Sequence, residues 1–399
     1  MKDLFTMNRK NYDASWKVFR RPSVRAIIIR EDKVLMIHSK KYDYYKFPGG
    51  GLDKGESHIQ ALIREVKEES GYQVIPESIK EYGQVLRRRK DDLAEETIFE
   101  QENFYYLCEV GDEISEVHLD DYEAEEGFTP VWIEPLEASY VDFNNRKKYI
   151  DPEMVERESK VLSIVDQELR KILREQKEKA WIKELGDIDY ADMLDFVKKT
   201  LDTKTEGNGS FKLEISYSRF DHTKRVLGWA KKLYDASTDK ENLCYEDLMI
   251  AAIFHDVGRA IADDTHVPHA QAGGPITEEY LLKHGFSAEK TAYIRGLVEG
   301  HSDKYLMKDP AVDRNLLLLM EADLLDDMGA MGILMDTMIT MSRNPQAQFT
   351  DCLDHIARFT QRQQKDNPLT SEAGRRFWDE KTALVDRYVE ALMADVELF

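Results

Sequence analysis

The 399-residue sequence has few cysteines, no long apolar run and a deficit of basic residues, and each shortage argues against a class of protein. Its three cysteines, Cys108, Cys244 and Cys352, lack any metal-type spacing, which argues against a disulfide framework or a zinc finger. No stretch of about 20 apolar residues is present, and the N-terminal segment has no apolar core of signal-peptide length. We therefore expect a cytoplasmic protein without a membrane partner.

Lysine and arginine number 56 against 77 aspartates and glutamates, so the formal net charge is -21. A non-specific nucleic-acid binder normally shows a basic face or tail, so this balance argues against nucleic acid as a partner. RNA-end processing stays as a weaker alternative, since local patches need not follow net charge. An anionic substrate would need metal ions or local arginines to hold it. Nothing in the sequence indicates the oligomeric state.

The length predicts two domains, and the pattern changes along the chain. Short β-rich runs fill the first third, with two strands around a turn at 31–33 and further strands at 102–110 and 128–136. A highly charged helical pattern covers about 152–180, and almost only helices follow from residue 190. We predict an α/β domain over 1–175, ending in a linker helix, and an all-α domain over 176–399. The acidic segment 112–126 is interpreted as a solvated connection.

A helix is predicted from His58 to Ser70, because Ser57 and Gln60 form a capping-box pattern and Gly71 is a natural stop. At about 100° per residue, three glutamates share one arc of this helix and the apolar residues share another. An exposed acidic face is the simplest interpretation of such a cluster. The glycines Gly49, Gly50 and Gly51 favour a different one, because bare carbonyls beside carboxylates suit Mg²⁺ or Mn²⁺.

This region resembles the Nudix box, G-x5-E-x7-R-E-U-x-E-E-x-G-U, with every charged position and both glycines matched. Tyr72 departs from the usual aliphatic residue at the last position, which affects packing rather than metal binding. The resemblance implies an α/β/α sandwich that cleaves a nucleoside diphosphate linked to another group. It implies metal ligands at the carbonyl of Gly49 and at Glu65, Glu68 and Glu69, with Arg64 holding the helix carboxylates and Glu56 supporting the site. Glu100, Glu102 and Glu126 are open alternatives for the general base.

A second set of residues lies in the helical half. His255 and Asp256 end an apolar helix, where an unpartnered charged pair would be costly, and a metal is the simplest partner. Together with the histidine of "HTKRVLGWA" and the aspartate of "EADLLDDMGAMG", they resemble the HD superfamily of metal-dependent phosphohydrolases. The resemblance implies that His222, His255, Asp256 and Asp323 bind the metal, with Asp256 also counted as catalytic.

This mixed imidazole and carboxylate shell suits Mn²⁺, Fe²⁺, Co²⁺ or Ni²⁺. His269 and His301 sit where two-metal members of the superfamily carry extra histidines, so they either bind a second metal or contact substrate phosphate. Arg259 is a candidate phosphate contact, and a salt bridge at the helix end is the alternative.

Both halves therefore resemble hydrolases of phosphate bonds. We predict a bifunctional nucleotide hydrolase. Its Nudix site would release a monophosphate from a nucleoside triphosphate or another nucleoside diphosphate-linked compound, and its HD site would act as a pyrophosphohydrolase or phosphatase. The alternative is a non-catalytic Nudix sensor that binds nucleotide and regulates the HD hydrolase. The base, the sugar, the leaving group and the order of the two sites are not indicated.

Overall fold

The computed structural model describes residues 1–202, 219–238 and 240–396. Contacts divide the chain into two compact units, Met1–Ala180 and Trp181–Phe399. The first contains strands and helices and the second contains helices, which confirms the predicted α/β and all-α parts. Among the residues described, no helix combines the length and apolarity needed to cross a membrane.

The N-terminal unit is built on one mixed sheet, one antiparallel sheet and a short ribbon. One sheet has the order β1 (Asp3–Asn8), β8 (Lys80–Lys90), β9 (Thr97–Leu107) and β2 (Lys17–Arg20), with β3 (Ser23–Ile27) also pairing with β9. The other has the order β11 (Phe128–Ile133), β5 (Lys33–Ser39) and β4 (Ile29–Arg30), with β6 (Tyr44–Lys46) also on β5. The ribbon pairs β7 (Tyr72–Val74) with β10 (Val110–Ile114). The strands predicted on both sides of 31–33 are β3 with β4, and β5.

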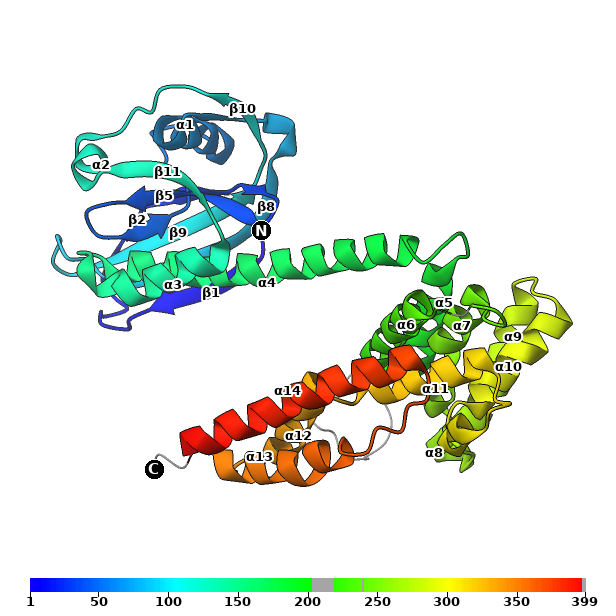
Figure 1. Ribbon diagram of the computed structural model, residues 1–399. Helices are drawn as coiled ribbons and strands as arrows, with labels where there is room; N and C mark the ends of the chain where they lie inside the picture. Colours follow the sequence, from blue (N-terminus) through cyan, green and yellow to red (C-terminus); the bar gives the residue numbers. More distant parts are fainter. Residues whose placement is uncertain (203–218, 239, 397–399) are drawn as a thin grey trace. The chain divides into compact units, whose positions relative to one another are not determined.

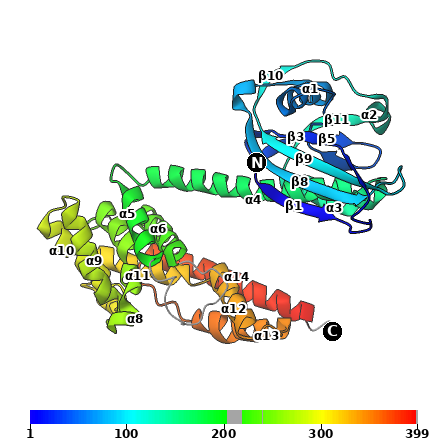
Figure 2. The same ribbon diagram turned by 180° about the vertical axis from the view of Figure 1, so that it is seen from behind.

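Helices cover both sides of these sheets. Figures 1 and 2 show α1 (His58–Ser70) on one side and α3 (Pro135–Asn145) with α4 (Pro152–Lys183) on the other. Side chains of a strand alternate between faces, so neighbours in sequence belong to different cores. Ala26 packs in one core with Leu62 of α1, whereas Ile27 packs in another with Leu162 of α4. The predicted α/β/α sandwich is therefore confirmed.

The helix α1 begins and ends where the sequence predicted. The Ser57 side chain accepts from the backbone N–H of Gln60, and the Gln60 side chain accepts from the backbone of Ser57. Gly71 closes the helix with a φ of 76°, a left-handed conformation that glycine adopts without a steric cost. Both ends are thus fixed by local chemistry.

Most residues of 112–126 are exposed, as expected of a solvated connection, but two of its carboxylates are buried. The segment continues β10 and then forms α2 (Asp121–Glu126), in which Glu123 and Glu126 are only 6% and 8% exposed. Glu126 accepts hydrogen bonds from the hydroxyls of Ser39 and Tyr44, which compensate for its burial. The sequence of the segment does not reveal this burial, because the partners of the two glutamates lie on the distant strands β5 and β6.

The C-terminal unit packs its helices around α7 (Tyr245–Phe254), whose residues from Leu248 onward are all buried. A helix that is apolar on every side belongs at the centre of a bundle, and α7 packs against α5, α6, α10 and α11. The bounds are α5 (Tyr190–Asp202), α6 (Arg219–Ala236), α8 (Ala262–Thr265), α9 (His269–Lys283), α10 (Ala288–Gly300), α11 (Arg314–Asp326), α12 (Ala330–Arg343), α13 (Phe349–Ile356) and α14 (Glu372–Val396). Short helical turns occupy Val257–Ala260, Lys304–Lys308 and Ala357–Gln361.

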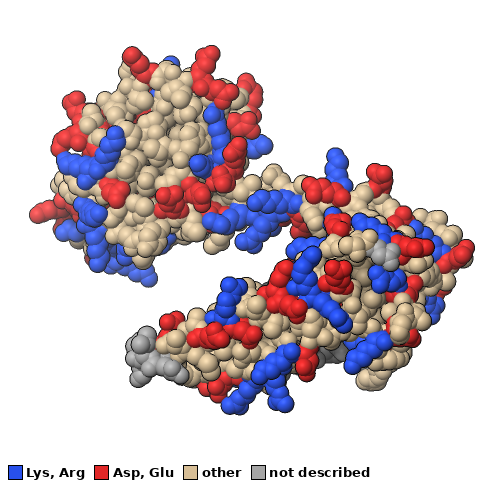
Figure 3. Space-filling view, in the orientation of Figure 1, with Lys and Arg blue, Asp and Glu red and all other residues tan. Residues whose placement is uncertain are grey.

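Basic and acidic side chains are interspersed over the visible face of each unit (Figure 3). On this face the net charge of -21 is therefore not gathered into a patch of one sign.

Candidate active sites

An open cavity of about 1290 Å³ lies in the N-terminal unit, and Glu65, Glu68 and Glu69 of α1 all line it. The glycine loop at 49–51 lines it as well. So do cations from four strands and the loop after β2, namely Arg20, Arg21, Arg25, Lys46, Arg87 and Arg89. The predicted carboxylates therefore share one pocket with groups that can hold an anion.

Arg64, which lines this pocket, holds three of the predicted carboxylates together. Its guanidinium makes two hydrogen bonds of 2.9 Å to Glu56, and its Nη1 donates to Glu65 at 2.9 Å and to Glu68 at 3.0 Å. Its Nη2 also donates to the carbonyl of Gly51 at 3.2 Å. These contacts hold Glu56, Glu65 and Glu68 around one cation, and they lower the pKa of Glu56.

Glu69 has a different set of partners. It is 2% exposed, and it accepts from Lys46 Nζ at 2.6 Å and from the backbone N–H of Gly49 at 2.9 Å. Burial raises the pKa of its carboxyl to about 7, against the opposing effect of Lys46. The carbonyl of Gly49, predicted as a metal ligand, accepts a hydrogen bond from Arg25.

Glu100, Glu102 and Glu126, the alternatives for the general base, are not among the residues that line this cavity. Glu100 pairs with Arg20 and Arg88 at 2.8 Å each. Glu123 lines the cavity instead, beside Lys46 at 3.4 Å and Tyr122, whose hydroxyl donates to it at 3.0 Å. Burial alone would raise the pKa of Glu123, but Lys46 and a backbone N–H lower it.

The donor set of this pocket fits divalent ions in part. Glu65 and Glu68 supply the carboxylate oxygens that Mg²⁺ or Mn²⁺ prefers. Glu69 and the Gly49 carbonyl already have cationic partners. Among the described residues, every group of three potential ligand atoms within 4.8 Å of one another lies in the C-terminal unit, not here.

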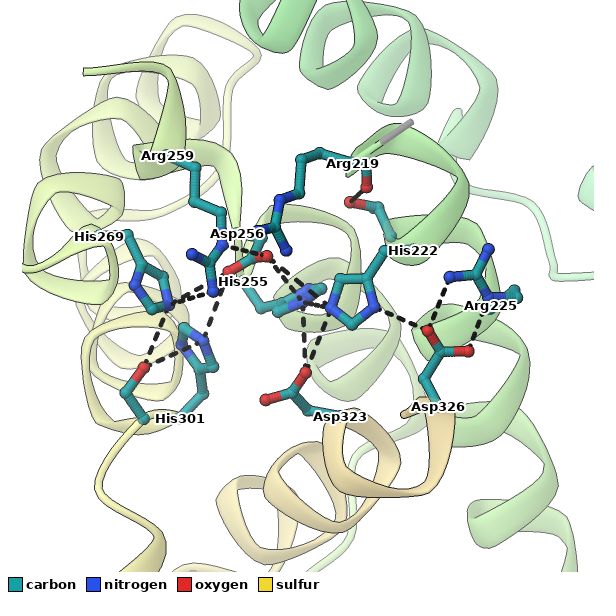
Figure 4. Close-up of polar contacts among 12 residues, drawn as sticks. Arg219, His222, Arg225, His255, Asp256, Arg259, His269, His301, Asp323 and Asp326 are labelled. Carbon is teal, nitrogen blue, oxygen red and sulfur yellow. Dashed lines mark hydrogen bonds and ion pairs between the residues drawn. The ribbon is translucent and has the colours of Figure 1, made fainter. Parts of the chain in front are cut away.

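In the C-terminal unit, His222, His255, Asp256 and Asp323 converge from α6, the end of α7 and α11 (Figure 4). His222 Nε2 lies 3.2 Å from Asp323 Oδ1, 3.3 Å from His255 Nε2 and 3.8 Å from Asp256 Oδ2. Three of these residues are at most 3% exposed. Buried imidazole nitrogens and carboxylate oxygens so close together fit a transition-metal ion.

Asp256 joins this group to a second one. Its Oδ2 faces His222 and His255, whereas its Oδ1 lies 3.1 Å from His269 Nε2 and 3.9 Å from His301 Nε2. Asp256, His269 and His301 also satisfy the geometry of a metal group. A carboxylate with one oxygen toward each group has the arrangement of a bridging ligand.

The buried imidazoles are oriented by hydrogen bonds at Nδ1. His255 Nδ1 lies 2.8 Å from the carbonyl of Ala252, and His301 Nδ1 lies 2.7 Å from that of Val298. A carbonyl only accepts, so each Nδ1 carries the proton and each Nε2 keeps its lone pair for a metal. Burial lowers the pKa of His255 and lowers that of His301 to about 3.

Two cations contact the acidic members. Arg259 donates from Nε to Asp256 Oδ2 at 2.5 Å and approaches His269 at 3.4 Å. Lys304 Nζ lies 2.7 Å from Asp323 Oδ2, the oxygen that is not directed at the histidines. Burial alone would raise the pKa of Asp323, but His222 and Lys304 hold it well below its usual range.

Sequence reasoning missed several of these residues. Asp326 contacts His222, and its signal was its spacing of three residues from Asp323 on one helix. Lys46 directly precedes the "FPGGG" run, which could have drawn attention to it. Glu123 has no such signal, because it is one of several acidic residues in 112–126. Lys304 follows His301 by three residues, but nothing in the sequence relates it to Asp323.

Comparison with protein-family models matches the NUDIX domain at residues 19–154 and the HD domain at residues 219–328. Among curated proteins, the RNA pyrophosphohydrolase of Campylobacter jejuni subsp. doylei is 40% identical over 85 residues, which are 20% of this chain and 49% of that protein. That of Nitratiruptor is 46% identical over 57 residues, 13% of this chain and 37% of that protein. The chain thus spans half or less of the length of these relatives.

Similar solved structures include Bacillus subtilis YpgQ in complex with ADP, at 17% identity and a TM-score of 0.36, covering 51% of this chain and 93% of YpgQ. A NUDIX hydrolase from Nitrosomonas europaea has 22% identity and a TM-score of 0.26, covering 36% of this chain and 90% of that one. The two matched families follow one another in the predicted order. The chain joins an N-terminal NUDIX domain to a C-terminal HD domain.

Proposed function

We propose that the chain is a metal-dependent nucleotide hydrolase with two active sites. The NUDIX site splits the diphosphate of a nucleoside triphosphate or another nucleoside diphosphate-linked compound and releases a monophosphate. The HD site acts on nucleotides as a pyrophosphohydrolase or phosphatase. The observation that carries the proposal is Asp256, whose two carboxylate oxygens face two groups of imidazoles. The pyrophosphohydrolases among the matched relatives support the bond type for the NUDIX site.

In the HD site, His222, His255, Asp256 and Asp323 would hold one ion, and Asp256, His269 and His301 a second. Divalent ions at such sites activate water and offset the charge that develops on phosphate. The residues of the chain would position the substrate. Arg259, which is one-third exposed, would exchange Asp256 for a substrate phosphate when an ion takes its place. Ser302 Oγ lies 3.2 Å from His269 Nε2 and 3.3 Å from His301 Nε2, so an ion bound to these nitrogens would displace the hydroxyl from them.

In the NUDIX site, Glu65 and Glu68 would hold the ions, whereas Glu69 and the Gly49 carbonyl, also predicted as ligands from the sequence, have Lys46 and Arg25 as partners. Arg64 would keep Glu56, Glu65 and Glu68 in position. Glu123 is the carboxylate best placed to accept a proton, because it lines the cavity while the three alternatives do not. Arg20, Arg21 and Arg89, at the rim, would hold the remaining phosphate charge.

The experiment uses the full chain, a panel of nucleoside triphosphates, nucleotide sugars and dinucleoside polyphosphates, and Mg²⁺ or Mn²⁺, with products resolved by chromatography. Glu68→Gln is expected to remove one set of products and Asp256→Ala the other. Glu125→Gln and Asp354→Ala are the matched controls, because both carboxylates are exposed partners of surface cations. Product profiles that neither active-site variant changes would reject the proposal.

The nucleotide sensor is the second candidate, and a specific observation favours it. Arg64, Lys46 and Arg25 already neutralise the acidic groups and the carbonyl of the NUDIX pocket. In that case, a nucleotide would raise the rate at the HD site and remain intact, and Glu68→Gln would leave the product profile unchanged. RNA belongs in the same panel, since relatives over part of this chain are named RNA pyrophosphohydrolase.

A further inference from the structure

The NUDIX pocket contains a buried ammonium where the resemblance places a metal ion. Lys46 Nζ lies 2.6 Å from Glu69 Oε1 and 3.4 Å from Glu123 Oε1, and it sits 4.6 Å from the centre of the Phe128 ring. Lys46, Glu69 and Glu123 are each less than a tenth exposed. Two buried carboxylates are therefore bridged by one side chain of the protein.

Position and packing keep Lys46 there. It is the last residue of β6, and its backbone pairs with Ile37 of β5, which fixes where its side chain begins. The contact with the Phe128 ring then favours the position of its ammonium beside Glu69. Two carboxylates so deeply buried need a cation, because the cost of desolvating an unpaired charge far exceeds that of a paired one. Lys46 meets that need within the fold.

The neighbouring ligand position is also occupied. Gly49 gives its N–H to Glu69 at 2.9 Å and receives a hydrogen bond on its carbonyl from Arg25. Arg25 is itself 7% exposed, and it also approaches the carbonyl of Phe47 at 3.4 Å. The carboxylate and the carbonyl predicted to share an ion thus belong to two organic cations instead. Glu65 and Glu68 differ, because the cation between them, Arg64, has a side chain that is 29% exposed, against 8% for Lys46.

We propose that Lys46 replaces one divalent ion in the NUDIX site, so that ions bind at Glu65 and Glu68 while Glu69 binds the ammonium and no metal. The substrate phosphates then meet metal charge on the Glu65 side and the fixed charges of Lys46 and Arg25 on the other. This inference rests on the proposed function only in placing ions at Glu65 and Glu68.

The test counts Mn²⁺ ions bound per full-length chain by equilibrium dialysis with metal analysis, without substrate. Ions in the HD domain contribute equally to every variant, so differences report on the NUDIX pocket. Glu69→Gln is expected to leave the count unchanged, whereas Glu68→Gln lowers it. Lys46→Met leaves Glu69 and Glu123 without a cation and is expected to bind one more ion, which the additional change Glu69→Gln removes.

Two further variants complete the design. Lys46→Arg keeps a cation and is expected to bind as many ions as the parent. Lys41→Met removes an exposed lysine that pairs with Glu125, which lies on α2 as Glu123 does. This variant controls for the loss of a positive charge. A count that falls on Glu69→Gln in the parent overturns the inference, and this variant decides the matter even if Lys46→Met does not fold. A count that Glu68→Gln leaves unchanged would instead reject the metal site of the proposed function.

Discussion

The Nδ1 atom of His222 lies 2.7 Å from Oδ2 of Asp326, which lies between this imidazole and the guanidinium of Arg225 (Figure 4). Arg225 holds Asp326 through hydrogen bonds of 2.8 and 2.9 Å. Asp326 is 1% exposed and Arg225 is partly exposed. The carboxylate therefore fixes the plane of the imidazole and directs Nε2 toward Asp323 and His255.

Asp326→Asn keeps an oxygen that can accept from Nδ1 but removes the negative charge. We expect it to weaken metal binding at the HD site by about 10–100-fold, because a carboxylate partner makes an imidazole a stronger ligand. Competition between the protein and a chromogenic chelator for Mn²⁺ or Co²⁺ measures this change directly. Asp354→Asn is the control, since Asp354 and its partner Arg358 are both exposed. Equal affinities in the two variants would contradict the role given to Asp326.

A pH dependence follows from the same histidine. Burial alone would lower the pKa of His222, but hydrogen bonds to Asp323 and Asp326 raise it to about 9 in the metal-free protein. An unfolded histidine has a pKa of about 6.5, so the stabilisation is fully present below that pH and is lost as the pH rises through about 9. We expect the melting temperature of the chelator-treated protein to fall across this window, and His222→Asn to remove most of the fall.

Metal binding should respond in the opposite direction, because an ion needs the unprotonated nitrogen. Added Mn²⁺ is therefore expected to raise the melting temperature more at pH 9 than at pH 6.5. Parallel pH profiles for the parent and His222→Asn would show that another group is responsible.

The sequence predicted α1 to the residue because its caps are local. Ser57, Gln60 and Gly71 act within one turn of the helix ends. The HD histidines were singled out by their order in the sequence, and the fold brings them close to one another. The partners of Glu69 were not predicted, since Lys46 and Glu123 reach it from β6 and α2 and only the folded sheet brings them together.

The run "LRRRK" shows the same limit. Alternation along β8 turns Arg87 inward, where it is 2% exposed and makes two hydrogen bonds of 2.7 Å to Asp151. Arg88, its neighbour, points to the other face and pairs with Glu100. The sequence of the run does not show which arginine is buried, because the partners of Arg87 and Arg88 lie elsewhere in the chain.

Gly258 follows His255 and Asp256, two of the proposed metal ligands, and has no room for a side chain. A Cβ there would overlap the backbone of His269 and Gly273 on α9. Gly258→Ala is expected to destabilise the protein by about 1–3 kcal/mol and to weaken metal binding, because α9 carries His269 and would be pushed away. Gly296→Ala is the control: nothing lies within 4 Å of its Cβ, and alanine in an exposed helix should stabilise by about 0.5–1 kcal/mol. Thermal unfolding and bound-metal analysis distinguish the two.

Arg157 and Glu158 form a fully buried ion pair in the N-terminal unit, both with 0% exposure. Arg157 also bonds Asn103 of β9, and Glu158 accepts from the backbone N–H of Phe47 at 3.1 Å. Arg157→Met would leave Glu158 charged and without its cation, so we expect a loss of about 3–5 kcal/mol. Hydrogen exchange of the β9 amides in the full chain measures that loss within this unit.

The same helix offers a matched control for that substitution. Arg170 pairs with Asp166 at 2.7 Å, but its side chain is 47% exposed. Water can solvate Asp166 once the arginine is gone, so Arg170→Met should cost no more than about 1 kcal/mol. Two equal losses would mean that burial of the Arg157 pair is not what makes it important. A larger loss at Arg157 would show that this buried arginine, through its bond to Asn103, holds α4 against β9, a strand whose Phe99 and Gln101 line the NUDIX cavity.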